Sequence, residues 1–358
     1  MAKAGIITFL HNDNYGSILQ AYALEQVLLA LQVNSEHLDY APDTWEKLRN
    51  MFRCGNSPSL ILEGLHKRSE SGAYARHEMM DAFRSSRLKL SARCRNAQEL
   101  ADAASGMDVL IAGSDQIWSP VWLNPIYFLT FANEKPKIAY ACSLGVQQLP
   151  RKRKRKIMQS SLQGFQSLSV REEEGAHLIE EISGIRPEVM PDPVLLLTPE
   201  EWSEMEDTAV SGVGRLVCYM IDTNPAYWER VKRTAEVLEL EPLIIPMTDE
   251  ARRQGWENAE GVTPERFIGL FHTASYVMTD SFHGAMFASI FSRQHTVLRR
   301  YEDGDPESKN SRIDQIQRML GYVSMDACRP DNWTALRISE LRKQGLEWLE
   351  IALSQAGV

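Results

Sequence analysis

The chain has 358 residues, of which 44% are hydrophobic and 24% are charged, so its composition is that of a folded globular protein and excludes a disordered or fibrous one. The 39 basic and 48 acidic residues give a formal net charge of −9, which argues against a general nucleic-acid binder. At about 150 residues per domain, this length predicts two domains or one large one.

The cysteines and the start of the chain indicate the compartment. The five cysteines are far apart and form no CxxC pair, which disfavours a zinc ribbon or an iron–sulfur cluster and suits a reducing compartment. The apolar stretch near the N-terminus reaches His11 and Asp13 too soon for a signal peptide. No apolar run approaches the ~20 residues of a membrane helix. We therefore expect a cytoplasmic protein.

The first half of the chain alternates short apolar runs with segments of helical periodicity. Residues 5–9 (GIITF) predict a buried strand, and residues 18–31 repeat apolar side chains at helical spacing. With a further strand at 37–41 they form a βαβ unit, which builds parallel sheets. Residues 42–105 are irregular, and we expect short inserted helices there. The alternation of strands and helices then resumes. We expect strands at 108–112, 137–142 and 167–171 and helices at 150–164 and 172–182.

A second α/β set follows the proline-rich stretch 187–199, which predicts an edge strand or a crossover. We place a linker at 200–214. Beyond it we expect strands at 216–221, 243–246, 276–279 and 296–299, and helices at 225–238, 264–274, 284–291, 310–320 and 334–353. The simplest architecture is an α/β fold with two doubly wound Rossmann-like domains facing a cleft. The expected limits are 1–200, with the helical insertion 42–105, then 213–333 and a C-terminal helix within 334–358.

The loops that follow the predicted strands are where ligands of open α/β sheets bind. Asn14, Tyr15 and Gly16 lie between the first strand and the first helix, where free N–H groups suit an anion, or where the same residues simply cap the helix. Ser114 and Asp115 follow a later strand. The Asp115 carboxylate can orient a sugar hydroxyl or cap a helix.

An arginine and a histidine follow two further strands. Arg171 ends a predicted strand, and its planar fork suits phosphate or carboxylate, or else it pairs with Glu172 as an ordinary ion pair. Ser281, His283 and Gly284 follow another strand. A histidine at a helix start with a glycine beside it favours a functional group over a purely structural one.

Two further groups of residues complete the candidates. Lys309, Asn310 and Arg312 lie at the start of a predicted helix, where they add positive charge to the site of His283 or only cap the helix. The basic run from Arg151 to Lys156 is typical of a nucleic-acid patch by composition, but a solvated helix start is favoured. Because six cations at a helix N-terminus oppose its dipole, an anionic lipid surface at the inner face of the cell membrane is one reason for them. No cluster of metal ligands is visible, so we predict neither a metal nor a cofactor.

Seven segments occur in series between residues 5 and 316. They are GIITFLHNDNYGSILQAYALEQVL, DVLIAGSDQIW, IAYACSLG, SLSVREEEG, PDPVLLLTPEEW, VMTDSFHGAMFASIF and NSRIDQI. Together they resemble the polysaccharide pyruvyl transferase family, and NYG-x-x-LQAYAL, GSDQIW and TDSFHG are the most specific of the matches.

The resemblance implies a fold like that of GT-B glycosyltransferases and a reaction with phosphoenolpyruvate. The pyruvyl group passes to two hydroxyls of a sugar in a bacterial capsule, exopolysaccharide or cell-wall glycan, or in its lipid-linked precursor. His283 matches the family's catalytic histidine, and Arg171 matches an arginine expected to hold the donor. Ser281 stands where other branches carry an arginine two positions before the histidine, so Arg312 and Lys309 are the candidates to replace it.

These expectations assign the two substrates to different domains. The second domain is expected to hold phosphoenolpyruvate through Ser281, Gly284, Lys309, Asn310 and Arg312. The first is expected to hold the acceptor sugar through Asn14, Tyr15, Gly16, Ser114 and Asp115. Two alternatives are a nucleotide-sugar glycosyltransferase of the GT-B type and a non-catalytic glycan-assembly protein. A dinucleotide oxidoreductase is poorly supported, because Gly212 and Gly214 precede a strand instead of following one.

Overall fold

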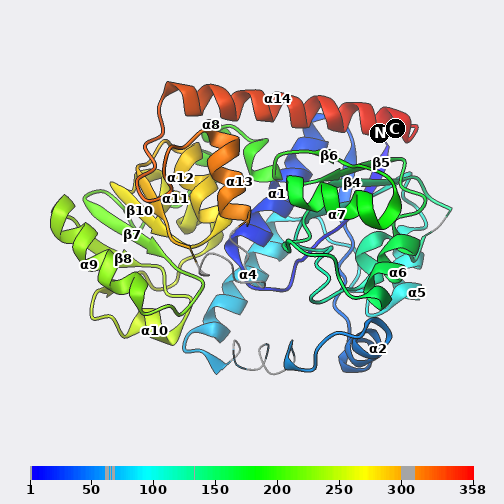
Figure 1. Ribbon diagram of the computed structural model, residues 1–358, viewed down its shortest axis with the longest axis horizontal. Coiled ribbons are helices and arrows are strands. Elements are labelled where there is room, and N and C mark those ends of the chain that lie inside the picture. Colours follow the sequence, from blue (N-terminus) through cyan, green and yellow to red (C-terminus); the bar gives the residue numbers. More distant parts are fainter. Residues whose placement is uncertain (1, 61–63, 65, 67–68, 133, 300–310) are drawn as a thin grey trace. The chain divides into compact units, whose positions relative to one another are not determined.

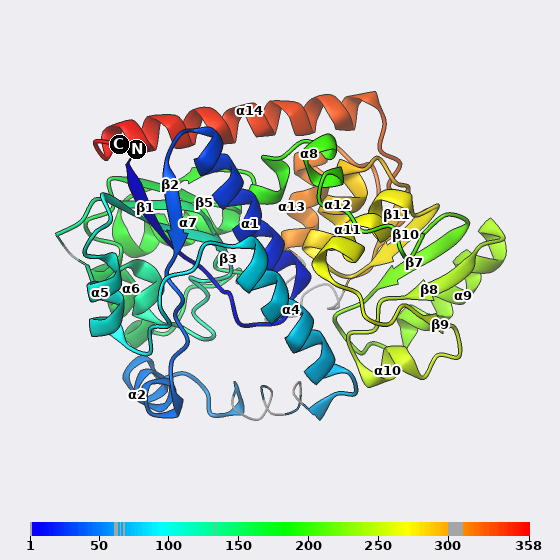
Figure 2. The same cartoon turned by 180° about the vertical axis from the view of Figure 1, so that it is seen from behind.

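The computed structural model describes the whole chain except Met1 and residues 61–63, 65, 67–68, 133 and 300–310, and it leaves out the side chains of Ser311 and Arg312. The chain groups into two compact units, whose elements are labelled in Figures 1 and 2. The first comprises Met1–Glu63, Arg84–Leu196 and Leu341–Val358, and the second comprises Gly64–Phe83 and Leu197–Glu340. The segment before Phe83 joins the second unit through contacts such as the bond from the Ser71 N–H to the Asp249 carboxylate, at 2.8 Å.

The first unit is built on a six-stranded parallel sheet in the order β2-β1-β3-β4-β5-β6. β3 and β4 are buried along their whole length, which explains their continuous apolar sequences, because a parallel sheet is covered on both faces. β2 lies on one side of β1 and β3 on the other, so the strand order reverses between β1 and β3. The strands are β1 (Lys3–Ile7), β2 (Asn34–His37), β3 (Val109–Asp115), β4 (Lys137–Cys142), β5 (Ser167–Val170) and β6 (Glu188–Val189).

Helices connect these strands, and most begin at side-chain caps that the sequence supplies. Asn14, Asp43 and Asn96 cap α1, α2 and α5, each accepting a hydrogen bond from a backbone N–H of the first turn. The described helices between β1 and residue 196 are α1 (Tyr15–Ala30), α2 (Thr44–Cys54), α4 (Ala73–Arg87), α5 (Ala97–Ala104), α6 (Lys152–Ser161), α7 (Glu173–Ser183) and the short 3₁₀ helices η1 (Pro125–Phe128) and η2 (Pro193–Leu195).

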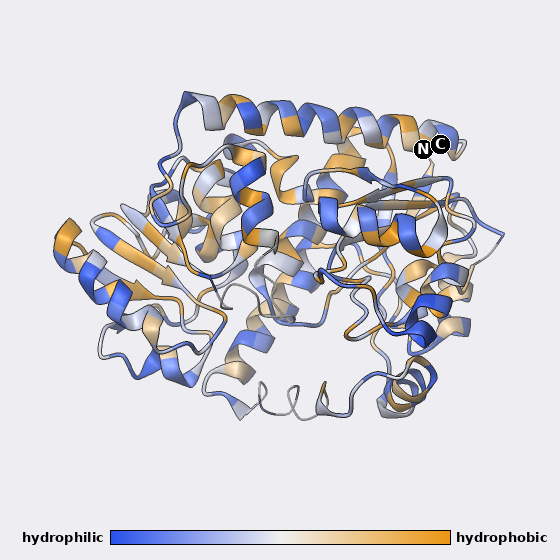
Figure 3. Cartoon of the chain, viewed as in Figure 1, coloured by the Kyte–Doolittle hydropathy of each residue, from blue (hydrophilic) through white to orange (hydrophobic). Residues whose placement is uncertain are grey.

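The second unit contains a five-stranded parallel sheet in the order β11-β10-β7-β8-β9, so its strand order reverses between β7 and β10. Its strands are β7 (Arg215–Tyr219), β8 (Glu241–Ile244), β9 (Glu257–Asn258), β10 (Tyr276–Thr279) and β11 (His295–Val297). Its described helices are α8 (Pro199–Ser203), α9 (Ala226–Leu238), α10 (Asp249–Arg252), α11 (Pro264–Thr273), α12 (Phe282–Ile290) and α13 (Ser311–Leu320). Figure 3 shows β7 as hydrophobic and α9 as mostly hydrophilic.

The chain ends in the long helix α14 (Asn332–Gln355). Its last part packs on the sheet of the first unit, where the Trp348 ring lies 5.8 Å from the Tyr140 ring and the Trp348 indole N–H donates to Glu188 at 2.6 Å. Among the described helices, neither α14 nor any other is apolar over enough length to cross a membrane.

The α/β class and the two doubly wound sheets are confirmed, but the strand predicted at 37–41 was wrong. The observed β2 covers Asn34–His37, because Leu38 and Tyr40 are buried beyond the end of the strand, where their apolar side chains imitate its pattern. The edge strand β9 escaped prediction, since two residues of the sequence Glu-Asn carry no apolar alternation.

His295 lies within β11 and is fully buried. Its Nδ1 lies 2.8 Å from the carbonyl oxygen of Arg293, and its ring meets the Tyr322 ring at 5.4 Å. A carbonyl accepts only from N–H, so Nδ1 carries the proton in this contact. Burial lowers the pKa of His295 to about 4, because the charged imidazolium would lose its hydration.

Acid should therefore destabilise the protein through His295. Between pH 6.5 and about 4, His295 is protonated in the unfolded chain but stays neutral in the folded chain. The free energy of unfolding therefore falls as the pH falls through this range. The slope from this residue is at most about 1.4 kcal/mol per pH unit. Urea unfolding across this range should show that contribution in the wild type and lose it in His295→Asn. The exposed His177→Gln serves as control, and equal slopes in the wild type and His295→Asn would contradict the prediction.

Candidate functional site

Each sheet has a topological switch point, which is where open α/β sheets bind ligands beyond the carboxyl ends of the strands. In the first unit it lies between β1 and β3, and in the second between β7 and β10. The residues predicted from the sequence fall at these points: Asn14, Tyr15 and Gly16 follow β1, Ser114 and Asp115 end β3, and Ser281, His283 and Gly284 follow β10.

Side-chain hydrogen bonds fasten the loop after β1 to the end of β3. Asn14 caps α1, its side-chain oxygen accepting from the N–H of Gly16 at 2.9 Å. The Ser17 hydroxyl donates to the Asp115 carboxylate and accepts from the Asn12 amide at 2.7 Å. The structure therefore brings Asn14 and Gly16 to the same switch point as Asp115.

Two other predicted acceptor contacts lie deeper in the first unit. The Ser114 side chain is fully buried; its hydroxyl donates to the Ala141 carbonyl at 2.8 Å, while its backbone N–H donates to Gln20 at 3.0 Å. Tyr15 is only 3% exposed in the first turn of α1. In this structure both residues pack the two loops together, and contact with an acceptor stays a prediction for them.

Arg171 lies directly after β5, buried among carboxylates and only 2% exposed. Its guanidinium donates to Asp192 at 2.6 Å and lies 3.9 Å from the Glu172 carboxylate. Burial by itself lowers the pKa of Arg171, but the surrounding carboxylates, Asp192 foremost, raise it above its ordinary value. Asp192 also lies 3.3 Å from the Ser114 hydroxyl, so the arginine supports the end of β3 through this carboxylate.

In the second unit, two side chains fasten the end of β10 to the end of β7. The Asp280 carboxylate accepts from the backbone N–H groups of Ile221 and Asp222, at 2.7 and 2.9 Å. The Thr279 hydroxyl donates to the Tyr219 carbonyl at 2.6 Å. These bonds fix the backbone from which α12 starts.

His283 lies in the first turn of α12, a helix whose residues are all buried. Ser281 caps this helix, its hydroxyl accepting from the N–H of Gly284 at 3.3 Å. The His283 side chain is 7% exposed, and its ring meets the Phe282 ring edge-on at 5.2 Å. A nearly buried imidazole is thus held by a helix that cannot move without disturbing the core.

The remaining candidates lie where α13 begins. Lys309 and Asn310 lie outside the described residues, and Arg312 belongs to α13 with its side chain undescribed. Their donor contacts stay predictions. Across the part of the chain that the structure describes, no group of three or more histidine, cysteine or acidic side chains could hold a metal ion.

A family model for polysaccharide pyruvyl transferases matches residues 14–300, a range that includes Asn14, Asp115 and His283. This chain belongs to the polysaccharide pyruvyl transferase family. No match was found among curated proteins.

Solved structures with a similar fold include nucleotide-sugar epimerases and a glycosyltransferase. S. aureus MnaA with UDP has a TM-score of 0.51 at 10% identity, covering 97% of this chain and 98% of its own. The UDP-GlcNAc 2-epimerase from Neisseria meningitidis, bound to UDP-GlcNAc, has a TM-score of 0.49 at 12% identity, covering 98% and 99%. The glycosyltransferase SnogD from Streptomyces nogalater has a TM-score of 0.45 at 12% identity, covering 99% of each chain. At such identities the similarity concerns the fold alone, and this pyruvyl transferase family member has a GT-B-like fold.

Two residues of the first unit's network escape prediction from the sequence. Asp192 lies in the proline-rich stretch 187–199, where an acid between two prolines is the only signal. Gln20 lies in the second turn of α1, where nothing in the sequence distinguishes it from an exposed helical glutamine. Its amide donates to the Thr8 hydroxyl at 3.0 Å, which only the fold brings near.

Gly284→Ala should destabilise the protein, because a Cβ there would lie 2.5 Å from the Thr279 hydroxyl oxygen and 3.1 Å from its Cβ. Thr279 cannot turn away without losing its bond to the Tyr219 carbonyl. Overpacking of this kind costs ~1–3 kcal/mol, which urea unfolding measures. Gly106→Ala is the matched control, since nothing lies within 4 Å of a Cβ at that position. Equal stability of the two variants would rule out the close contact.

Proposed function

We propose that this protein transfers the pyruvyl group of phosphoenolpyruvate to two hydroxyls of one sugar, in a bacterial glycan or its lipid-linked precursor, and releases phosphate. Family membership supports the reaction class. The observation that carries the assignment of residues is the position of His283, nearly buried in the first turn of α12 and fixed by the loop that Asp280 fastens to the end of β7.

The reaction requires a proton on the methylene carbon of phosphoenolpyruvate, because this makes the neighbouring carbon C2 electrophilic. His283 is the proposed donor, since an imidazole can serve as acid and as base near neutral pH. One sugar hydroxyl then bonds to C2, and the second bonds to the same carbon as the C2–O bond to phosphate breaks. One hydroxyl proton restores His283, and the other leaves with the phosphate.

Phosphoenolpyruvate carries a phosphate and a carboxylate, so its site needs fixed positive charge and little competing water. In this proposal the start of α12 contributes backbone N–H groups, with Ser281 and Gly284 beside the ligand. Lys309, Asn310 and Arg312 supply the contacts that an arginine at position 281 would otherwise make.

Arg171 takes a positioning role in this proposal. To hold the donor it would have to exchange Asp192, which it contacts at 2.6 Å, for the ligand. Breaking a buried ion pair costs ~3–5 kcal/mol when one charge is left without its partner. We therefore assign Arg171 to supporting the end of β3, and assign the acceptor contacts to Asn14 and Asp115.

Replacing His283 should abolish turnover and leave the fold intact. Loss of one general acid typically lowers the rate ~100- to 10,000-fold, and we expect this range for His283→Gln. The measurement is phosphate release from phosphoenolpyruvate across a panel of sugar and lipid-linked sugar acceptors. In D₂O, the methyl group of the wild-type product should carry one deuterium from solvent.

The exposed His177→Gln is the matched control and should retain wild-type turnover. Near-wild-type turnover in His283→Gln would overturn the role of this residue. If the wild type is stabilised against heat by a nucleotide sugar and not by phosphoenolpyruvate, the reaction itself is wrong, and a nucleotide-sugar glycosyltransferase becomes the better interpretation.

The basic run at residues 151–156 is explained in part by hydrogen bonds from two of its side chains to backbone carbonyls. Arg153 donates to the carbonyls of Phe52 and Arg53, at 2.8 and 2.9 Å, which lie in the last turn of α2 where carbonyls have no helical partner. The Lys154 ammonium donates to the Pro120 carbonyl at 2.5 Å, and burial lowers its pKa. The other four cations are exposed: Arg151, Lys152, Arg155 and Lys156.

These four exposed cations are the part of the run that we propose meets anionic lipid at the inner face of the cell membrane. Each basic residue near such a surface contributes ~1 kcal/mol, so replacing all four by glutamine should weaken vesicle binding at least tenfold. Co-sedimentation with phosphatidylserine vesicles at low and high salt measures this, with neutral vesicles for comparison. The double variant Lys232→Gln/Arg233→Gln, on exposed positions of α9, should bind as the wild type does. Binding that is insensitive to salt, or to the four substitutions, would remove the proposal.

A further inference from the structure

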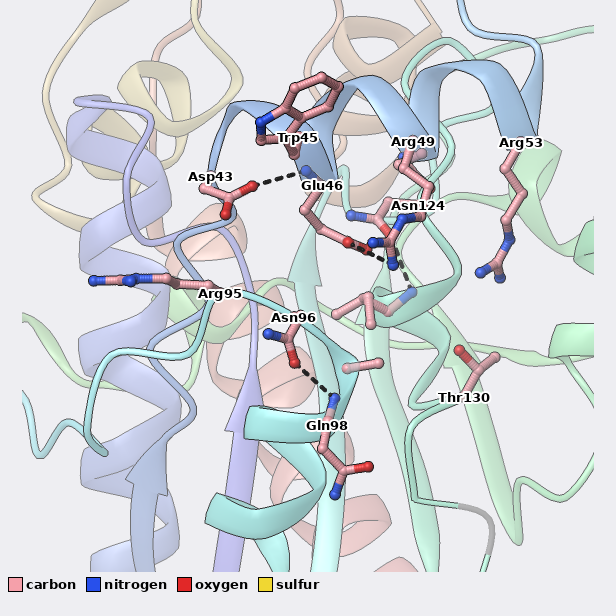
Figure 4. Close-up of a pocket in the computed structure, with 13 residues that line it drawn as sticks. Asp43, Trp45, Glu46, Arg49, Arg53, Arg95, Asn96, Gln98, Asn124 and Thr130 are labelled. Atoms are coloured by element: carbon pink, nitrogen blue, oxygen red, sulfur yellow. Dashed lines mark hydrogen bonds and ion pairs between the residues drawn. The ribbon is translucent and has the colours of Figure 1, made fainter.

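A pocket of about 510 Å³ opens in the first unit, and none of the site residues predicted from the sequence lines it (Figure 4). Three arginines line it: Arg49 and Arg53 of α2, and Arg95 just before α5. Figure 4 shows Arg49 and Arg53 reaching from α2 towards the segment of Asn124 and Thr130. The volume lies within the ~300–1,000 Å³ typical of ligand pockets.

The place of this pocket in the fold favours a ligand. Its walls come from α2, which follows β2, from the segment after β3, and from residues 95–98. The chain leading to Arg95 runs parallel to the end of β2, as the bridges from His37 to Leu90 and from Tyr40 to Cys94 show. All three walls therefore lie beyond carboxyl ends of the first sheet, the edge at which such sheets bind ligands.

The wall formed by α2 is anchored to the wall formed after β3. The side-chain amides of Asn50 and Asn56 both donate to the Leu123 carbonyl, at 2.9 and 3.0 Å. Arg153 holds the last turn of α2 from the other side, through the carbonyls of Phe52 and Arg53. The pocket is therefore a built feature of the unit, because α2 cannot swing away without breaking these bonds.

The lining of the pocket carries a small excess of positive charge. Arg49 pairs with Glu46 at 3.2 Å, and its own side chain remains 72% exposed. Within the described part of the chain, the guanidinium groups of Arg53 and Arg95 make no hydrogen bond or ion pair. Asp43, the other acid of the lining, is committed to capping α2, where it accepts from the N–H of Glu46 at 2.8 Å. The lining thus contains three arginines and two carboxylates, in a protein whose net charge is −9, although the Arg95 side chain points away from Arg49 and Arg53 in Figure 4.

The side chains of the lining suit a ligand in which an anionic group is attached to a sugar ring. The arginines would bind the anion, and Trp45 would contact the ring. Guanidinium groups bind carboxylate and phosphate through paired hydrogen bonds, with a geometry that lysine does not offer. Trp45 lies at the rim on the outer side of α2, 78% exposed, where its flat apolar face is open to a sugar ring (Figure 4).

We propose that this arginine pocket, defined by Arg49, Arg53 and Arg95, binds a negatively charged sugar through its carboxylate or phosphate. That the sugar belongs to the acceptor rests on the proposed function, because the pocket lies in the unit to which we assign the acceptor. The protein would then act on acidic or phosphorylated glycans and discriminate against neutral ones.

The binding test uses three probes that separate the possible sources of the anion. Trigalacturonate supplies carboxylates, glucose 1-phosphate supplies a phosphate, and maltotriose supplies neither. Isothermal titration should show binding of a charged probe that weakens as salt rises, because these arginines are exposed to solvent. Maltotriose should bind at least tenfold more weakly. If no charged probe binds, or maltotriose binds as well, the proposal is overturned.

Variants locate the site. Arg53→Gln/Arg95→Gln should weaken binding of the charged probe at least fivefold and leave thermal stability nearly unchanged, since these two guanidinium groups make no hydrogen bond or ion pair with described residues. Lys232→Gln/Arg233→Gln removes the same charge elsewhere and should bind as the wild type does. If the sugar ring packs on Trp45, binding of the charged probe should change the tryptophan fluorescence of the wild type. Trp45→Phe should remove this change. Equal affinity in the pocket variant and the control variant would overturn the assignment.

The proposed function and this pocket can fail separately. Stabilisation by phosphoenolpyruvate should be the same in the wild type and in Arg53→Gln/Arg95→Gln, because the donor is assigned to the other unit. If phosphoenolpyruvate has no effect and trigalacturonate still binds through Arg53 and Arg95, the pocket stands and the reaction is wrong. If the arginine variants lose binding to anionic vesicles but no free sugar binds, the surface is a lipid contact and the pocket proposal is wrong.

Discussion

Both units depend on one constraint of parallel sheets. Where the strand order reverses, two neighbouring strands lead into loops that go to opposite sides, and the backbone ladder does not join those loops. A buried aspartate makes the join in each unit: Asp280 accepts two N–H groups from the chain after β7, and Asp115 accepts from the Ser17 hydroxyl. Each carboxylate exchanges water for fixed donors, which offsets the cost of its burial. The positions of His283 and Asn14 follow from these two joins.

Arginines serve two different purposes in the first unit, and whether an arginine is buried or exposed decides which purpose it serves. Arg171 is 2% exposed and committed to Asp192, so its charge stabilises the end of β3 and attracts little from outside. Arg53 and Arg95 are exposed around a pocket, where their charge is available to a ligand. An arginine at the end of a strand is therefore weak evidence for an anion site until its carboxylate partners are known.

The sequence predicted most elements of the fold because their signals are local. Apolar runs mark β3, β4 and β10, and apolar side chains at helical spacing mark α1. Prediction failed at β2, because buried apolar residues continue beyond the last paired residue of the strand. It also failed at β9, because a strand of two residues is too short to carry a pattern. It also gave no sign that the segment ending at Phe83 belongs with the second unit, because that depends on contacts such as the bond from Ser71 to Asp249.

The sequence by itself determined the fold class, the family and the strand-end position of His283, since each of these depends on residue order along the chain. Only the tertiary structure decided which charges are compensated. Arg171 and Asp192 are 21 residues apart, and Ser17 and Asp115 are 98 apart, yet each pair shares a hydrogen bond. The arginine pocket likewise combines α2 with two distant segments. Electrostatic interactions act through space, so the partners of a charge are set by the fold and cannot be read from its neighbours in sequence.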